Sequence, residues 1–214
     1  LMESLADRDL LMKELHHRTG NNLALIVALI RMSKTHSSHD ETRQVLGELE
    51  TRVAALSKAH ELMQRAANAG TIVASDLLNE VATNAERAFN ASDLRVRIVV
   101  QCEPLQMDGK LAVDIGLIVG ELITNAYKHA FTDRCEGVIE VRLTGTPGSG
   151  LTLLVQDDGI GLTDPEARPE RSNSLGWRLI RTLTFQNNGT LTVDGQQGLA
   201  VKITFEPVAD PPLA

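Results

Sequence analysis

The first 70 residues contain no proline, and this absence is the strongest constraint that the sequence places on its own fold. Apolar residues recur there at helical spacing in two stretches, which THSSHD at 35–40 separates. The stretches cover about 4–34, with Leu15, Leu23, Ile26 and Ile30, and about 40–67, with Val45, Leu49, Leu56 and Met63. They predict two long helices folded into a hairpin. Because a lone hairpin cannot bury both stripes, we expect a second copy to pair with it as a four-helix bundle.

After Gly70 the pattern changes, and strands alternate with helices. Helices are predicted at 77–89, 109–131 and 174–186, strands at 94–101, 138–145 and 151–156, and a closing hairpin at 189–207. These elements make a mixed sheet with three helices, an α/β two-layer sandwich. The fold class is therefore α+β. We divide the chain into a helical hairpin at 1–70, the sandwich at 71–208 and a frayed tail at 209–214.

The charge balance argues against a partner with a polyanionic surface. Lys and Arg number 21 and Asp and Glu number 28, so the formal net charge is −7. A general nucleic-acid or anionic-membrane binder would need a basic surface, so we expect neither partner. Local backbone amides and a metal ion can still hold a nucleotide.

Cysteine usage and apolar runs indicate the compartment. Cys102 and Cys135 lie in unrelated contexts without a CxxC motif, which favours a reducing compartment and no zinc site. The longest apolar run, Leu23–Ile30, is far shorter than the roughly 20 residues of a membrane-spanning helix. The N-terminus is acidic where a signal peptide would be basic. We expect a cytoplasmic chain, or the cytoplasmic piece of a longer one.

The loop QDDGIGL at 156–162 is the first candidate for chemistry. Asp157 ends a predicted strand, and Gly159 and Gly161 follow it at alternate positions. Glycines let the backbone approach a ligand closely, and a carboxylate at a strand end can accept from an amino group. Alone, the motif is more typical of an ordinary hairpin turn than of a ligand loop.

The helix that precedes this loop carries a polar row. Glu121, Asn125 and Lys128 lie within about 60° of one another on the helix, at 100° per residue. A carboxylate and an amide oxygen suit a metal ion that bridges phosphates, and the lysine would neutralise charge. Downstream, Gly176 opens a helix whose free amides favour a phosphate. A solvated helix face could explain the row alone, but the three features together indicate a nucleotide site.

These segments resemble the GHKL ATPase superfamily of gyrase-like ATPases, Hsp90, sensor histidine kinases and MutL. ELITNAYKHAF is similar to its N box, DDGIGL to its G1 box and SLGWRL to its G2 box. The resemblance implies a Bergerat-type sandwich that binds ATP and Mg²⁺, with 161–173 as a short lid. Its implied residue roles are these: Glu121 and Asn125 hold the metal, with Glu121 also acting in catalysis; Lys128 and His129 approach the phosphates; Asp157 accepts from the adenine amino group; and Gly159, Gly161 and Gly176 shape the site.

The N-terminal helix resembles the phosphoacceptor segment of the HRxxN histidine kinases, which are related to the HWE kinases. The match is His17-Arg18-Thr19-Gly20-Asn21. The resemblance makes His17 the phosphoacceptor. A neutral imidazole is a competent nucleophile near pH 7, Arg18 could offset phosphoryl charge, and Asn21 could orient a water or an incoming carboxylate. His16 and His17 would otherwise be a pair of exposed helix residues.

The resemblance covers about 5–207 and implies the transmitter half of a sensor histidine kinase. Its activity would be autophosphorylation of His17 and transfer to the receiver-domain aspartate of a response regulator, within a homodimer. Three residues depart from the usual pattern: Gly20, where relatives often carry lysine, Trp177 and Leu199. A mid-helix glycine costs about 1 kcal/mol relative to alanine. We therefore expect the helix to bend or loosen near His17, which would favour phosphate transfer or removal over rapid autophosphorylation.

Three other functions remain open from the sequence. The first is a histidine-phosphotransfer or phosphatase protein of the same fold with little kinase activity. The second is a GHKL-type serine kinase of the anti-sigma kind, whose product would be acid-stable. The third is a dimerising scaffold with a vestigial site, which ATP would not stabilise. His36 and His39 flank the inter-helix turn and are expected to be solvated rather than metal ligands.

Overall fold

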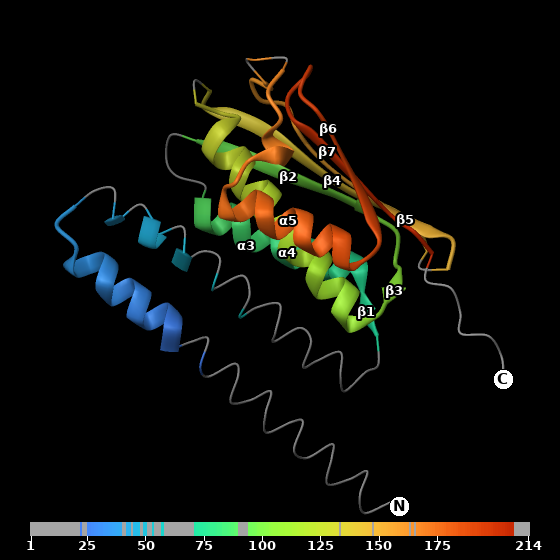
Figure 1. Cartoon of the computed structure of the whole chain (residues 1–214), viewed down its shortest axis with the longest axis horizontal. Helices are drawn as coiled ribbons and strands as arrows, with labels where there is room; N and C mark the ends of the chain where they lie inside the picture. Colours follow the sequence, from blue (N-terminus) through green and yellow to red (C-terminus); the bar gives the residue numbers. More distant parts are fainter. Residues whose placement is uncertain are drawn as a thin grey trace, which may run out of the picture. The chain divides into compact units, whose positions relative to one another are not determined.

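The chain divides into two compact units, Leu1–Gly70 and Thr71–Ala214. The computed structural model describes residues 22, 25–39, 42–43, 45–47, 49–50, 53, 57, 71–89, 94–132, 134–146, 148–162, 164 and 166–207. Figure 1 labels the elements of the second unit.

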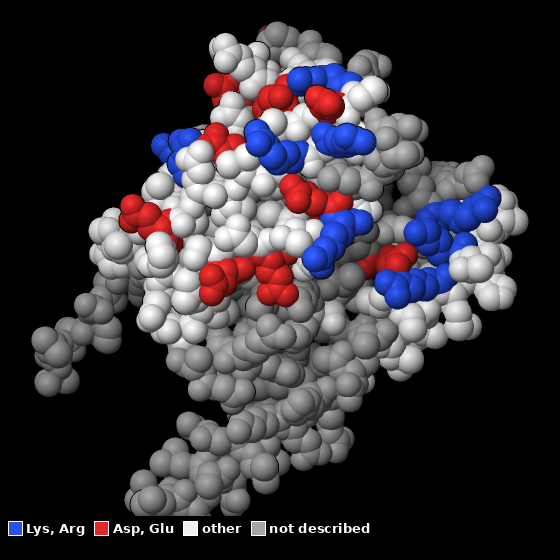
Figure 2. Space-filling model, turned by 180° about the vertical axis from the view of Figure 1, so that it is seen from behind, with Lys and Arg blue, Asp and Glu red and all other residues white. Residues whose placement is uncertain are grey.

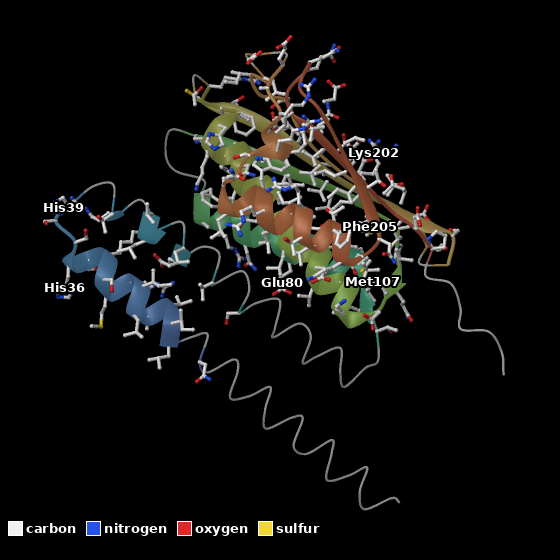
Figure 3. All side chains as sticks on the ribbon, in the orientation of Figure 1. His36, His39, Glu80, Met107, Lys202 and Phe205 are labelled. Carbon is white, nitrogen blue, oxygen red and sulfur yellow. The ribbon has the colours of Figure 1, made fainter. Side chains whose placement is uncertain are left out.

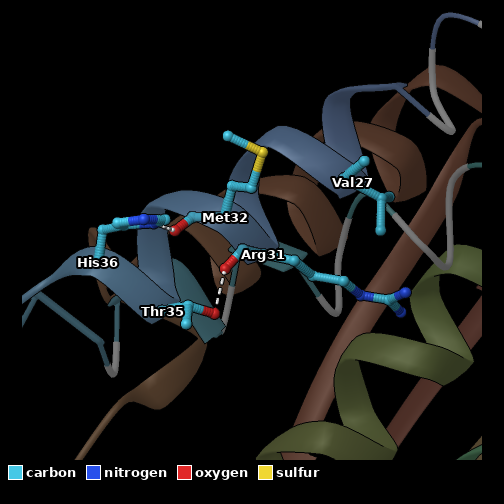
Figure 4. Close-up of a pocket in the computed structure, with 6 residues that line it drawn as sticks. Val27, Arg31, Met32, Thr35 and His36 are labelled. Atoms are coloured by element: carbon cyan, nitrogen blue, oxygen red, sulfur yellow. Dashed lines mark hydrogen bonds between the residues drawn. The ribbon is translucent and has the colours of Figure 1, made fainter.

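In the first unit, 25–36 are helical and 37–39 form the turn that the sequence predicts. The helix runs two residues past the predicted end. In its last turns the Thr35 hydroxyl donates to Arg31 O at 2.9 Å, and His36 Nδ1 lies 2.8 Å from Met32 O. Figure 4 shows both contacts beside a hollow lined by Val27, Ala28, Arg31, Met32, Thr35 and His36.

In the second predicted helix of this unit, every described residue from 42 to 57 is helical. Glu50 joins it to the first helix, since its carboxylate lies 2.6 Å from Arg31 Nε and 3.3 Å from Lys34 Nζ. The bond from Arg31 is the main reason that the pKa of Glu50 lies below its ordinary value. These ion pairs link the two helices of the predicted hairpin.

The second unit is a two-layer sandwich, as predicted. Its sheet has the order β2-β4-β5-β7-β6, in which β2 and β4 are parallel and all other pairs are antiparallel. The strands are β2 (Arg95–Cys102), β4 (Glu136–Thr146), β5 (Gly150–Asp157), β6 (Gly189–Asp194) and β7 (Ala200–Phe205). The helices α3 (Ala74–Phe89), α4 (Gly109–His129) and α5 (Leu175–Gln186) cover one face of this sheet (Figure 1).

The core lies between the sheet and the helices. Inward strand residues alternate with exposed or half-buried ones, and the fully buried side chains include Ile139, Val141, Leu153 and Ile203. The opposite face of β7 exposes Lys202 (Figure 3). Seen from behind, the molecule intersperses acidic and basic side chains instead of gathering one sign (Figure 2).

A two-stranded ribbon precedes α3 and α4 and was not predicted. β1 (Ile72–Val73) pairs antiparallel with β3 (Gln106–Met107), and Ala74 N donates to Leu105 O at 2.7 Å. Strands of two residues are too short to show an alternating pattern, which is why the sequence does not reveal them.

The free edge of β2 is occupied by side chains of the helical layer. Glu86 of α3 accepts from Ile98 N at 2.7 Å, and the Tyr127 hydroxyl of α4 donates to Val96 O at 3.4 Å. The Tyr127 ring also stacks on Phe89 with centroids 4.9 Å apart. Burial raises the pKa of Tyr127 to about 12, so the hydroxyl stays a donor at neutral pH.

Candidate nucleotide site

Asp157 ends β5 with its side chain on the inner face of the sheet. It is only 5% exposed, although a carboxylate is costly to bury. Its Oδ1 accepts from Gly159 N at 3.0 Å and from Leu199 N at 3.1 Å. Burial raises the pKa of Asp157 above its ordinary value; the two backbone bonds oppose the rise and the charge of Asp158 adds to it. Among the described residues, nothing donates to Oδ2, so this oxygen can accept from a ligand.

The predicted glycines give the loop room to turn. A Cβ at Gly159 would lie 2.4 Å from Ala130 O, and Gly161 has a φ of +68°, which disfavours any side chain. Gly198 was not predicted to shape the site. It has a φ of +75°, and a Cβ there would lie 1.8 Å from Asp157 O. The sequence signal for it is the DGQQG turn between β6 and β7.

α4 carries the predicted polar row. Asp108 caps it by accepting from Lys110 N at 2.8 Å, and the expected apolar stripe is buried at Ile115, Ile118 and Leu122, while Leu111 is half-buried. α4 packs against both α3 and α5, which makes it the central helix of its layer.

The burial of the row excludes the solvated-face explanation for Glu121, which is only 6% exposed. Asn125 and Lys128 are half-buried, and His129 is exposed. The Asn125 Nδ2 atom is buried and has no hydrogen-bond partner among the described residues. That end of the amide is therefore not committed to the protein's own hydrogen bonds.

The structure brings the DxGxG loop against the end of this helix. Ile160 N donates to Ala130 O at 3.0 Å, one residue after His129, and Gly159 packs on the same residue. The loop that follows Asp157 therefore packs against the end of the helix that carries Glu121 and Asn125.

The glycine-opened helix α5 begins as predicted at the cap residue Ser174, whose hydroxyl accepts from Trp177 N at 3.5 Å. Gly176 and Trp177 are buried in its first turn. The preceding segment ends in a 3-10 turn, η1 (Pro169–Arg171), and Arg181 of α5 holds it by donating to Glu170 O at 2.6 Å and Ser172 O at 2.8 Å. These bonds tie the end of the predicted lid to α5.

Two family models match the chain in succession. Residues 14–97 match HisKA_2, described as histidine kinase, and residues 110–210 match HATPase_c, described as histidine kinase-, DNA gyrase B-, and HSP90-like ATPase. Among solved structures, the histidine kinase domain of a blue-light-activated histidine kinase from Erythrobacter litoralis is similar at a TM-score of 0.66 and 27% identity, covering 93% of this chain and 94% of that one. The chain carries the HisKA_2 and HATPase_c domains of histidine kinases.

Two curated relatives agree with this family. The chain is 33% identical over 196 residues to blue-light-activated histidine kinase 2 of Erythrobacter litoralis, covering 89% of this chain and 55% of the relative. It is 29% identical over 205 residues to sensor histidine kinase PdtaS of Mycobacterium tuberculosis, covering 92% and 38%. The chain thus spans about half or less of the length of these relatives. The resemblance predicted from the N, G1, G2 and HRxxN segments is confirmed.

His17, Arg18 and Asn21 lie outside the described residues, so their roles stay predictions. His36 and His39 are exposed beside the turn of the hairpin (Figure 3). Within the described ranges of the chain, no group of three His, Cys, Asp or Glu side chains could hold a metal ion, and no helix is long and apolar enough to span a bilayer.

Proposed function

We propose that this histidine kinase chain is a transmitter. It binds ATP, transfers the γ-phosphoryl group to His17, and passes that group to a receiver-domain aspartate of a response regulator. The observation that carries the nucleotide part is the buried Asp157 carboxylate, which has one oxygen held by backbone amides and the other open to a ligand. An acceptor-only group of this kind complements the amino group of adenine. The family match supports the transfer steps.

The residues of α4 fit a magnesium ion. Glu121 offers a buried carboxylate, and Asn125 offers an amide oxygen on a side chain whose nitrogen is not held by any described residue. Carboxylate and amide oxygens are the hard ligands that Mg²⁺ takes alongside phosphate oxygens. We assign Glu121 and Asn125 to hold it, and Lys128 and His129 to approach the phosphates. When bound, the ion would supply charge neutralisation for phosphoryl transfer.

The transfer itself asks the chain mainly for positioning. A ring nitrogen of neutral His17 forms a bond to the γ-phosphorus while the bond from that phosphorus to its bridging oxygen breaks, so ADP leaves. Arg18 offsets phosphoryl charge, and Asn21 orients the next acceptor. An aspartate oxygen of the receiver then takes the phosphoryl group, which frees the imidazole.

Incubation with γ-labelled ATP tests this function. We expect acid-labile label on the native chain and none on His17→Ala or Asn125→Ala. His36→Ala, which changes an exposed histidine beside the hairpin turn, is the matched control and should keep its label. Acid-stable label on a partner protein would instead indicate the serine kinase. ATP binding without label on His17, together with dephosphorylation of a phosphorylated regulator, would indicate the phosphatase.

We also propose that two hairpins pair in solution. The support is apolar surface on the first unit, where Leu25, Leu29, Met32 and Val45 are each at least 51% exposed. Burial of such side chains against a second copy would remove that surface from water. Light scattering should give a dimer mass, and Leu29→Glu should lower it toward the monomer; a monomeric native chain contradicts the pairing.

A further inference from the structure

Directly after β5, one backbone hydrogen bond of the sheet is replaced by a bond to a side chain. Residues 138 and 158 face each other one step beyond the last ladder pair, Ile139 with Asp157. Asp158 N donates to Val138 O at 3.1 Å, as a regular antiparallel pair requires. The return bond is different, because Val138 N donates to the Asp158 side chain at 2.8 Å rather than to its carbonyl. The carboxylate thus replaces the backbone acceptor.

Arg134 donates to the carbonyl of Asp158, to which Val138 N does not donate. Its Nη1 donates to Asp158 O, and its Nη2 lies 3.4 Å from Asp158 Oδ2. One guanidinium therefore holds both the backbone and the side chain of Asp158. Its rigid planar fork suits such a two-point contact better than the compact ammonium of a lysine does. The chain is fixed at the point where it leaves the sheet.

The same turn orients Asp157. Its Oδ1 accepts from Gly159 N two residues on, the geometry of an Asx turn, so the carboxylate faces the way it does only while residue 158 keeps its conformation. Arg134 itself follows α4, where its backbone N donates to Phe131 O at 3.3 Å. It therefore links the end of the helix that carries Glu121 and Asn125 to the turn that carries the adenine acceptor.

We propose that Arg134, acting through Asp158, is a positioning residue for nucleotide recognition, which holds the turn that directs the Asp157 carboxylate at the amino group of adenine. This inference rests on the proposed function. Arg134 touches no ligand in this scheme, and its effect is on the base rather than on the phosphates. Its loss should therefore weaken base discrimination more than phosphate binding.

Titration calorimetry of the full chain with Mg²⁺–ADP and Mg²⁺–GDP tests the proposal without turnover. Guanine carries an oxygen where adenine has its amino group, so a directed carboxylate should favour ADP. We expect Arg134→Ala to reduce the preference for ADP by about five- to tenfold, the value of one directed hydrogen bond, with GDP binding within about twofold of native. Arg134→Lys keeps the charge without the fork and should lose about two- to threefold.

Arg142→Ala is the matched control. Its side chain is 43% exposed, as is that of Arg134, and it is also paired with a carboxylate, Glu140. It should keep the native preference. An unchanged preference in both Arg134 variants overturns the proposal, as does an equal loss of ADP and GDP affinity. If Arg134→Ala does not fold, as judged by thermal unfolding without nucleotide, Arg134→Lys decides. A native chain that binds neither nucleotide overturns the proposed function, and the inference falls with it.

Discussion

At the scale of single residues, the chemistry depends on one buried carboxylate. Asp157→Asn keeps an oxygen for Gly159 N and Leu199 N but places an amide donor where the open oxygen stands. Two donors would then face each other when adenine binds. We expect ATP affinity to fall by roughly ten- to a hundredfold, because a buried donor is left without an acceptor. Calorimetry with ATP and GTP checks this, and equal losses for both nucleotides would contradict it.

The pKa of Asp157 gives a second prediction at this scale. Burial raises it in the folded state, so the folded chain binds the proton more readily than the unfolded chain does. The sign follows from linkage: the carboxyl favours folding below its unfolded pKa, and this advantage is lost as pH rises through the folded pKa. Asp157→Asn does not titrate. The free energy of unfolding of Asp157→Asn minus that of the native chain should therefore increase from about pH 4 to pH 7. Urea unfolding without nucleotide measures this difference.

A constant difference between the two proteins across that range would mean that burial does not govern Asp157. Both predictions concern a residue that the sequence identifies only when its DDG motif is combined with the polar row of α4 and with Gly176. The sequence could not show that two backbone amides hold one oxygen, because one of them comes from Leu199, 42 positions away. Contacts of that separation depend on the β5–β7 pairing rather than on any local pattern.

At the scale of elements, the contact between the DxGxG loop and α4 is tight. Gly159→Ala places a methyl group 2.4 Å from Ala130 O, so the loop or the helix end must move. We expect about 1–3 kcal/mol of destabilisation, together with weaker ATP binding. The control is Gly148→Ala in the β4–β5 turn, where a methyl group meets nothing within 4 Å. Urea unfolding of both variants checks this, and equal stability contradicts it.

The cap of α4 supports a separate prediction, because it stabilises the helix without touching the ligand residues. Asp108→Ala removes the acceptor for Lys110 N and Leu111 N, at a cost of about 1 kcal/mol. ATP affinity should stay within about twofold of native. A variant as stable as native in urea would show that water replaces the cap.

The helices and longer strands could be predicted because each shows a period and an end signal in the sequence. The Asp108 cap and the stripe of Ile115, Ile118 and Leu122 are examples. The order of the strands in the sheet and the β1–β3 ribbon could not be predicted, since both depend on pairing between distant segments. The role of Arg134 could not be predicted, because an arginine after a helix is common in sequences. Its role depends on its contact with the carbonyl of Asp158, 24 positions away.

At the scale of the whole molecule, the described ligand-type residues belong to the second unit, which has its own core. A fragment that starts at Thr71 should therefore fold and be stabilised by Mg²⁺–ATP, by about 2.7 kcal/mol at a hundredfold excess over Kd. It should not label itself, because His17 lies in the other unit. Thermal unfolding with and without ATP measures the shift. A fragment that unfolds without a cooperative transition contradicts the division.

The occupied edge of β2 has a consequence for how the protein behaves when it is concentrated. An exposed strand edge with open donors and acceptors invites another chain to add a strand, which is how many sheets begin to aggregate. Here Glu86 already takes the Ile98 amide, and Tyr127 already reaches the Val96 carbonyl. A strand arriving from a neighbouring molecule would have to displace both side chains first, so polymerisation through this border is disfavoured.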